Sequence, residues 1–170
     1  MDQFLDLLFF LIPAYLANSS PVVLGGGPPL DFNITLPDGR RMLGDSKTIR
    51  GFAGGVLAGT VAGGVLAVYP LPYFSGPEQQ FFAGFLLSLG TMAGDSFGSF
   101  LKRRMGFPPG KPFWLDTVLF LLFALLLVYP VARPALYQPV NLLVFVLLTA
   151  VLHPLTNAVA NRIGLKKVPW

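Results

Sequence analysis

The sequence predicts an all-α integral membrane protein, a bundle of five transmembrane helices forming one domain over residues 1–170. Three observations predict this class. The chain is 54% hydrophobic and only 12% charged, whereas soluble domains carry about 25% charged residues. Its mean hydropathy is +0.65. The apolar residues also gather in segments of about 20, which is the length that crosses a bilayer core.

The first span, residues 4–24, follows an N-terminus without basic residues, so it should stay in the membrane rather than be cleaved as a signal peptide. A polar run at 18–21 weakens its end. The last span, 140–160, is weakened in the same way by His153 and Pro154. The three spans between them are more uniformly apolar: 51–74, 81–101 and 113–132.

The connection between the first two spans, residues 25–50, is a loop long enough to cover a site. Glycines and prolines at 25–29 break any helix. Residues 33–36 and 40–43 are expected to form the arms of a short hairpin, because the Pro-Asp-Gly sequence at 37–39 favours a turn.

Glycines at a four-residue spacing mark the second and third spans. They are Gly51, Gly55, Gly59 and Gly63 in the second span, and Gly90, Gly94 and Gly98 in the third. A row of small residues gives a helix a flat face, so two backbones can approach closely and gain van der Waals contact. The rows therefore predict helix packing, with a homodimer interface as the competing use of one face.

Basic residues gather in alternate connections. Eleven of the 12 Lys and Arg residues lie in 25–50, in 102–112 or after residue 160, and the remaining one is Arg133. The positive-inside rule places these connections in the cytoplasm. We therefore expect a multi-pass protein of the cell membrane, with its N-terminus outside and its C-terminus and active site on the cytoplasmic side.

Two aspartates interrupt apolar spans below this basic face. A membrane carboxylate costs about 2.5–3.5 kcal/mol on insertion scales and marks a functional site. Asp95 and Asp116 lie at similar depths, about 5–10 Å at about 1.5 Å per residue, on spans joined by a short connection. Two close carboxylates repel unless they share a proton or hold a cation. With Lys102, Arg103 and Lys111 at the rim, we expect Mg²⁺ on both aspartates and a phosphorylated substrate. A buried ion pair such as Asp95 with Lys102 is the alternative.

Polar residues near these aspartates extend the candidate site. Ser99 lies between Asp95 and Lys102 on one face of the third span, at i+4 and i+7 from the aspartate. The Gly-Asp-Ser-Lys-Thr sequence at 44–48 lacks the complete phosphate-loop pattern, but Lys47 is expected to contact phosphate.

The fifth span carries a polar stripe that opens toward the same face. It consists of His153, Asn157 and Asn161. A histidine before a proline in a membrane span more often makes a packing contact than acts as a base, so no catalytic role is assigned to it. Asn18 and Ser19 are expected to close the same cavity from the first span.

Two segments resemble CDP-diacylglycerol synthases. Residues 45–55 resemble their lysine-threonine and Gly-Phe-x-Gly-Gly segment. Residues 94–103, followed by Asp116, resemble their signature of Gly-Asp, Ser-x-x-Lys-Arg and a later Asp-Arg. The chain departs from that family in three ways: its Lys-Asp is replaced by prolines at 108–109, its His-Gly-Gly is absent, and its Asp-Arg is Asp116-Thr117.

The small size of the chain and the stretch 17–41 are more similar to the archaeal CDP-archaeol synthases, a resemblance that covers essentially the whole chain. The resemblance implies cytidylyl transfer from CTP to 2,3-bis-(geranylgeranyl)-glycerol 1-phosphate, with release of pyrophosphate. It also implies that Asp95 and Asp116 bind metal, and that Lys102 and Arg103 are the signature pair. The implied partners are CTP, an isoprenoid glycerol-phosphate lipid and the bilayer, with no nucleic acid.

The residues suit this chemistry. A lipid phosphate has a second pKa of about 6, so it is already ionised at neutral pH and can act as a nucleophile without a general base. The reaction then needs positioning and charge neutralisation. The expected phosphate contacts are Lys47, Arg50, Lys102, Arg103 and Lys111. The expected catalytic set is Asp45, Lys47, Asp95, Lys102 and Asp116, in which Asp45 holds a lysine or a second metal ion.

Two other functions compete with this interpretation. A CDP-alcohol phosphatidyltransferase is also a small, magnesium-dependent membrane enzyme. Its Asp-Gly-x-x-Ala-Arg signature is absent, because the Asp-Gly at 38–39 is followed by two arginines without the further spaced aspartates. A cation-coupled carrier would use Asp95 and Asp116 for its cargo, and inverted repeats would support it. The sequence contains none that we recognise.

Overall fold

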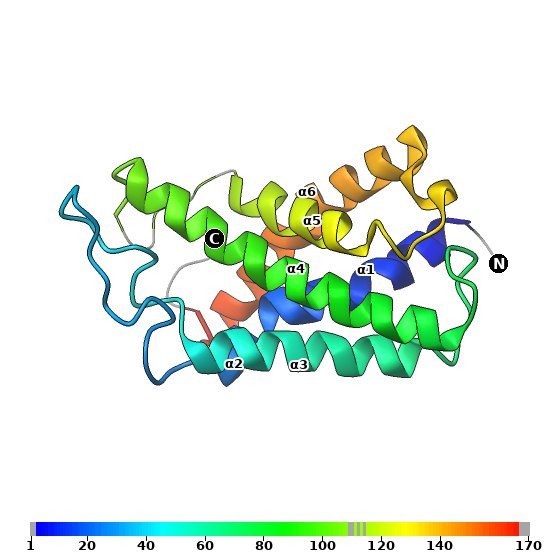
Figure 1. The fold of residues 1–170 in the computed structure, drawn as a ribbon, viewed down its shortest axis with the longest axis horizontal. Helices are drawn as coiled ribbons and strands as arrows, with labels where there is room; N and C mark the ends of the chain where they lie inside the picture. Colours follow the sequence, from blue (N-terminus) through cyan, green and yellow to red (C-terminus); the bar gives the residue numbers. More distant parts are fainter. Residues whose placement is uncertain (1–2, 109–110, 112, 114, 167–170) are drawn as a thin grey trace.

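The computed structural model describes residues 3–108, 111, 113 and 115–166, which form an elongated bundle of helices (Figure 1). The elements in chain order are α1 (Gln3–Ser19), α2 (Pro21–Leu24), α3 (Ile49–Leu66), α4 (Pro77–Arg104), α5 (Leu115–Val128), the 3₁₀ helix η1 (Pro134–Tyr137) and α6 (Pro139–Arg162). The all-helical class predicted from the sequence is confirmed for the described residues, which contain no named strand.

Three helical segments have the length and apolar composition of membrane spans. They are Gln3–Leu24, which joins α1 and α2, Ile49–Leu66 and Pro139–Arg162. Helix α5 is apolar but shorter, at 14 residues. The many exposed apolar side chains of α6, such as Leu143, Val146 and Leu147, suit a lipid-facing surface.

Two helices end earlier than the sequence predicts. The second span was expected to run to residue 74, but α3 ends at Leu66. The fourth was expected over 113–132, but α5 covers only Leu115–Val128. Prolines explain both ends: Pro70 and Pro130 follow closely, and a proline disfavours helical geometry in the residue before it.

The predicted glycine packing is confirmed. The buried residues of α3 are the four members of its glycine row. A side chain at Gly63 would lie 2.8 Å from the Cα atom of Gly84 on α4, so these two backbones are in direct contact. A side chain at Gly90 would lie 2.5 Å from the carbonyl oxygen of Phe123 on α5. These glycines therefore let the backbone of α4 pack directly against α3 and α5.

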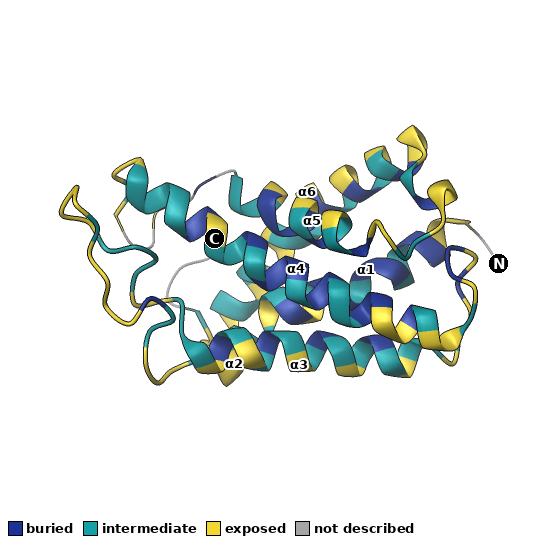
Figure 2. Cartoon of the chain, viewed as in Figure 1, coloured by how far each residue is buried: buried dark blue, intermediate teal, exposed yellow. Residues whose placement is uncertain are grey.

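Helix α4 lies at the centre and contacts α1, α3 and α5. Figure 2 shows buried residues concentrated along the middle of α1 and α4. The core includes Phe10, Leu87, Phe120 and Phe145, all 2% exposed or less. At one end of the bundle, the left in Figure 1, the loop between α2 and α3 lies beside the start of α3 and the end of α4.

The hairpin expected in this loop is present in minimal form. Thr35 and Arg41 form an isolated antiparallel bridge. The amide of Gly39 donates to the Leu36 carbonyl at 2.9 Å, which closes the turn. Gly39 has a positive φ of 74°, a conformation that glycine adopts readily.

Candidate active site

Two lysine–aspartate ion pairs lie at the loop end of the bundle. The Lys47 ammonium, just before α3, donates to Oδ2 of Asp95 on α4. Lys102 at the end of α4 donates to Oδ2 of Asp116 on α5, with an N–O distance of 2.6 Å. All four side chains are between 14% and 26% exposed, so the pairs are partly removed from solvent. We call these four residues the paired site.

The pairing differs from the example given for the alternative to a metal site. That alternative was a buried ion pair such as Asp95 with Lys102, whereas Asp95 pairs with Lys47 and Lys102 pairs with Asp116. The repulsion between two membrane carboxylates is therefore balanced by two ammonium groups in this structure. This arrangement joins three elements, because Lys47 belongs to the loop while the other three residues belong to α4 and α5.

The local sequence explains how these residues are held. Thr48 caps α3, accepting a hydrogen bond from the Gly51 amide at 3.0 Å, and so fixes the preceding Lys47. Asp116 lies in the first turn of α5, where the helix dipole favours a carboxylate. A side chain at Gly98 would lie 3.3 Å from Oδ1 of Asp116, so glycine makes room for this carboxylate against α4.

A small pocket opens directly beside the first pair. Its polar lining comes from the loop and from α4, including Ser46, Lys47, Asp95 and Ser96. Its apolar lining includes Pro21 of α2 and Phe52 of α3. The loop therefore contributes one wall of this pocket, as its length suggested.

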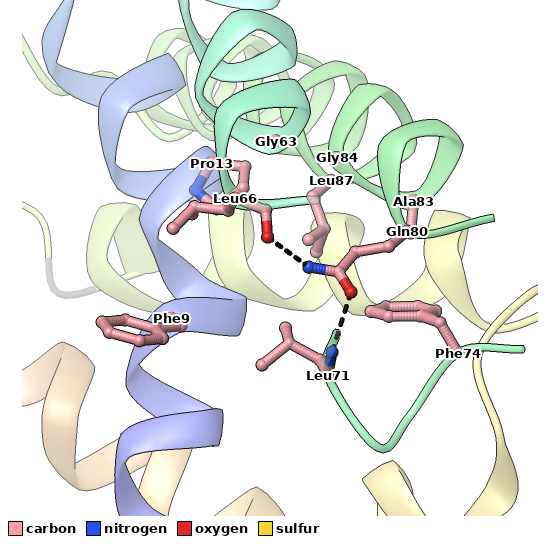
Figure 3. A pocket seen from close by; sticks show the side chains of 10 residues that line it. All are labelled: Phe9, Pro13, Gly63, Leu66, Leu71, Phe74, Gln80, Ala83, Gly84 and Leu87. Carbon is pink, nitrogen blue, oxygen red and sulfur yellow. Dashed lines mark hydrogen bonds between the residues drawn. The ribbon is translucent and has the colours of Figure 1, made fainter. Parts of the chain in front are cut away.

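A second pocket lies toward the other end of the bundle and has a different character (Figure 3). It is lined by apolar side chains and Gln80. The Gln80 amide donates to the Leu66 carbonyl and accepts from the Leu71 amide, both at 2.9 Å. These bonds fasten the α3–α4 connection, and no charged residue lines this pocket.

The loop is braced by a carboxylate that sequence analysis missed. Asp31 is fully buried and accepts bonds from the Arg41 guanidinium, at 2.6 Å, and from the Leu43 and Gly44 amides. Burial alone would raise the pKa of Asp31, but these bonds together hold it well below its usual range. A lone acidic residue between prolines and a hairpin gives no sequence signal of this role.

A second brace fastens the loop to the end of α4. Arg40 donates to the Arg104 carbonyl at 2.7 Å, and Arg104 donates to the Arg41 carbonyl at 2.7 Å. Arg104 also pairs with Asp38 at 2.5 Å. The carbonyls at the end of a helix lack intrahelical partners, so Arg40 satisfies one of them. The loop is thus tied to the helix that carries Asp95 and Lys102.

The structure brings only part of the predicted set together. Asp45 lies apart from the paired site: its side chain is 88% exposed and pairs with Arg41, not with a lysine as expected. Arg103 lies beside the loop, with Nε 3.9 Å from the position of a side chain on Gly44. Arg50 and Lys111 are both exposed.

The polar stripe of α6 faces α5 and the chain beyond α6. His153 Nδ1 lies 3.2 Å from the hydroxyl of Thr117, the residue after Asp116, and its ring stacks on Phe120. Asn157 accepts a hydrogen bond from the Lys166 ammonium at 2.9 Å. Ser19 does not close the pocket, since it is exposed and its hydroxyl bonds to the Tyr15 carbonyl. Asn18 is not among the pocket's lining residues either.

The apolar helices long enough to cross a bilayer define a multi-pass membrane protein, with a partly enclosed set of ionisable residues at one end of the bundle. A solved structure described as an intramembrane enzyme for archaeal membrane lipids biosynthesis has the same fold. The TM-score is 0.78 and the identity 37%, over 91% of this chain and 94% of that chain.

The chain belongs to the CDP-archaeol synthase family, whose CarS-like model matches residues 1–170. The CDP-archaeol synthase of Pyrococcus furiosus is 46% identical over all of both chains. That of Methanopyrus kandleri is 48% identical over 96% of this chain and 91% of its own. That of Archaeoglobus fulgidus is 42% identical over 100% of this chain and 99% of its own. The family resemblance found in the sequence motifs is confirmed.

Proposed function

We propose that the paired site catalyses CDP-archaeol synthesis, the transfer of a cytidylyl group from CTP to 2,3-bis-(geranylgeranyl)-glycerol 1-phosphate. Family membership over the whole chain makes the protein a CTP-dependent nucleotidyltransferase of archaeal lipid biosynthesis. It also rules against the phosphatidyltransferase and carrier alternatives. The observation that supports the assignment within the fold is the presence of two lysine–aspartate pairs at the loop end of the bundle, the first of which lines a polar pocket.

The proposed reaction needs no general base from the protein. A lipid phosphate oxygen attacks the α-phosphorus of CTP, and the bond from that phosphorus to the bridging oxygen of the β-phosphate breaks. Pyrophosphate leaves with that oxygen and its electron pair, so the CDP-lipid contains one new phosphoanhydride bond. The nucleophile is already ionised at neutral pH, because the second pKa of a phosphomonoester is about 6.

The protein's part is to place two anions in line and to neutralise their charge. Lys47 and Lys102 now contact carboxylates, and both can contact phosphate oxygens once substrate enters. Arg103 adds a guanidinium beside the loop, while exposed Arg50 and Lys111 are suited to guide the triphosphate at the rim. Asp45 contributes indirectly in this proposal, by holding Arg41 in the loop brace.

The carboxylates fit a magnesium ion delivered with the nucleotide. Mg²⁺ is held in enzymes by one or two carboxylates together with substrate phosphates, rather than by a complete protein cage. Among the described residues, no group of three or more His, Cys, Asp or Glu side chains could hold a metal ion, so substrate phosphates would have to complete the coordination. We propose that Asp95 and Asp116 hold this ion, which would neutralise phosphate charge as the new bond forms.

We also propose that five segments cross the membrane, with α4 and α5 completing the set. The 28 residues of α4 are ample for a span. The 14 residues of α5 rise only about 21 Å, less than a hydrocarbon core of about 30 Å. Helix α5 would then begin below the membrane surface, with Asp116 in its first turn.

An assay with purified protein tests the function. Radiolabelled CTP, Mg²⁺ and the geranylgeranyl glycerol phosphate should give one labelled lipid and an equal amount of pyrophosphate. Labelled lipid should not form without Mg²⁺. Formation of labelled product only when a CDP-lipid and an alcohol are supplied would instead identify a phosphatidyltransferase.

The orientation can be tested by cysteine labelling, because the chain has no cysteine of its own. A cysteine at Gly110 would report on the basic connection between α4 and α5, but Gly110 lies outside the described residues. The cysteine is therefore placed at exposed Thr35, in the loop between α2 and α3. Thr35→Cys should react with an impermeant reagent only from the cytoplasmic side, and Ser75→Cys only from the outside. Reaction of both variants from the same side would contradict the proposed topology.

A further inference from the structure

A contact between α6 and the beginning of α5 has no part in the mechanism above. The imidazole Nδ1 of His153, on α6, lies 3.2 Å from the hydroxyl of Thr117. The same ring stacks on Phe120, with 5.5 Å between the ring centroids. Thr117 and Phe120 stand three residues apart on α5, so they share one face of that helix. The imidazole therefore lies against the beginning of α5, the part of the helix that carries Asp116.

The histidine ring is held by a closely packed neighbour. Phe120 is fully buried, and its ring meets that of Tyr15 on α1 edge to face at a centroid distance of 5.8 Å. A side chain packed on several sides cannot move without opening a void, so Phe120 offers the imidazole a fixed surface. Stacking on this surface sets the plane of the imidazole and so the direction of Nδ1. The Thr117 hydroxyl can donate to this nitrogen or accept from it.

The Thr117 hydroxyl connects two helices. Other hydroxyls in the bundle bond within their own helix: Thr60 on α3 and Ser88 on α4 each donate to the carbonyl four residues earlier, at 2.7 Å. Such a bond satisfies the hydroxyl but does not fix the helix relative to its neighbours. Thr117 instead meets a side chain of α6. Because polar contacts between helices hold membrane bundles together, this one fixes α5 relative to α6.

The place of this turn decides where the Asp116 carboxylate points. Amides in the first turn of a helix lack intrahelical partners, so helix ends are held less tightly than helix centres. On the α4 side, Lys102 donates to Oδ2 of Asp116 and Gly98 leaves room for Oδ1. On the α6 side, His153 holds the residue that follows Asp116. The beginning of α5 is therefore fastened from both neighbouring helices.

We propose that His153 is a positioning residue of the active site, which acts through Thr117 to hold the first turn of α5 and so keeps Asp116 directed toward the magnesium ion. This inference rests on the proposed function, because Asp116 is a magnesium ligand only in that function. In this role the imidazole touches neither substrate nor metal and transfers no proton. Removing the partners that orient metal ligands typically costs about 10–100-fold in metal affinity or activity. A contact one residue away from the ligand belongs at the lower end of that range.

Two pairs of variants separate the hydrogen bond from packing. His153→Phe keeps a ring that can stack on Phe120 but removes both nitrogens, whereas His153→Asn keeps a polar group near the position of Nδ1. Thr117→Val removes the hydroxyl at nearly constant shape, and Thr117→Ser keeps it. His153→Phe and Thr117→Val should each raise the Mg²⁺ concentration for half-maximal transfer about tenfold. His153→Asn and Thr117→Ser should raise it no more than about threefold, since the hydrogen bond is kept. The double variant His153→Phe/Thr117→Val should be no worse than either single variant, because both changes remove the same bond.

Manganese binding gives a readout that does not depend on turnover. Mn²⁺ suits the same carboxylate and phosphate oxygens as Mg²⁺, and the ion bound to protein is counted from the loss of its electron paramagnetic resonance signal. The sample contains CTP but no lipid phosphate, so no transfer occurs, and CTP with Mn²⁺ alone is the blank. The apparent Kd for Mn²⁺ should rise about tenfold in His153→Phe and in Thr117→Val.

Thr60→Val is the matched control, because it removes a hydroxyl that bonds within its own helix. It should leave the magnesium requirement and Mn²⁺ binding unchanged. An unchanged magnesium requirement in Thr117→Val would overturn the proposal, and so would an equal rise in Thr117→Ser. A lower melting temperature in His153→Phe with normal Mn²⁺ binding would also overturn it, because the contact would then be purely structural. If His153→Phe does not fold, Thr117→Val decides the matter. Failure of the proposed function looks different, because the unmodified protein would then form no CDP-lipid in the assay.

Discussion

Asp95→Asn and Asp116→Asn should each reduce cytidylyl transfer by at least about a hundredfold to a thousandfold, the usual effect of removing a group that organises transition-state charge. The folded protein should survive both changes, because neutralising a membrane carboxylate removes an insertion cost. Lys47 and Lys102 lose their partners in these variants, but both are partly exposed and can turn toward water. Initial rates at saturating CTP and lipid phosphate measure the loss.

The double variant separates a shared site from two independent ion pairs. If both carboxylates hold one magnesium ion, Asp95→Asn/Asp116→Asn should be scarcely slower than either single variant, because removing one ligand already destroys the site. Independent ion pairs would instead give losses that multiply. Lys102→Ala should mainly raise the KM, since Lys47 and Arg103 remain nearby.

Glu78→Gln is the matched control for these variants. Glu78 is an exposed acidic residue in the first turn of the same helix, α4, far along the chain from the paired site. Its change should leave the transfer rate within about twofold, as expected for a surface position away from the chemistry. Substantial magnesium-dependent turnover in either aspartate variant would contradict the proposed metal site and favour purely structural ion pairs.

The sequence indicates which residues belong to the candidate site more directly than it indicates their ion-pair partners. Asp95 and Asp116 stand out because carboxylates are rare in apolar spans. The spacing along α4 offered Lys102 as an ion-pair partner of Asp95, in the alternative to a metal site, but Asp95 pairs with Lys47. That pairing depends on a loop folded around buried Asp31, whose bonds to Arg41 and to backbone amides join residues about ten positions apart. No local pattern encodes such a contact.

The fold shows the same division between local and long-range signals. The glycine rows predicted close packing correctly, because a four-residue spacing of small residues has one geometric meaning in a membrane helix. Hydropathy predicted that α3 and α5 extend further along the chain than they do, because apolar residues continue past Pro70 and Pro130.

Gly59→Leu should lower the melting temperature in detergent by about 6–12 °C. Gly59 faces Pro13 of α1 and Ser88 of α4: a side chain there would lie 2.5 Å from the Pro13 carbonyl oxygen and 2.9 Å from the Ser88 Cβ atom. Overpacking a tight site costs about 1–3 kcal/mol, and a backbone contact that cannot move aside belongs at the upper end. For a chain of this size, each kcal/mol corresponds to about 2–4 °C.

Gly55→Leu should have a smaller effect in the same measurement. A side chain at Gly55 meets the flexible end of Met92, which can move, although the Ala17 carbonyl oxygen at 2.8 Å limits the space. Ala53→Leu, on an exposed position of the same helix, controls for the larger side chain and should leave the melting temperature nearly unchanged. Because Lys47 lies two residues before the start of α3, displacing this helix should also weaken the Lys47–Asp95 pair and reduce transfer. Full stability in both glycine variants would show that this row faces lipid instead of α1 and α4.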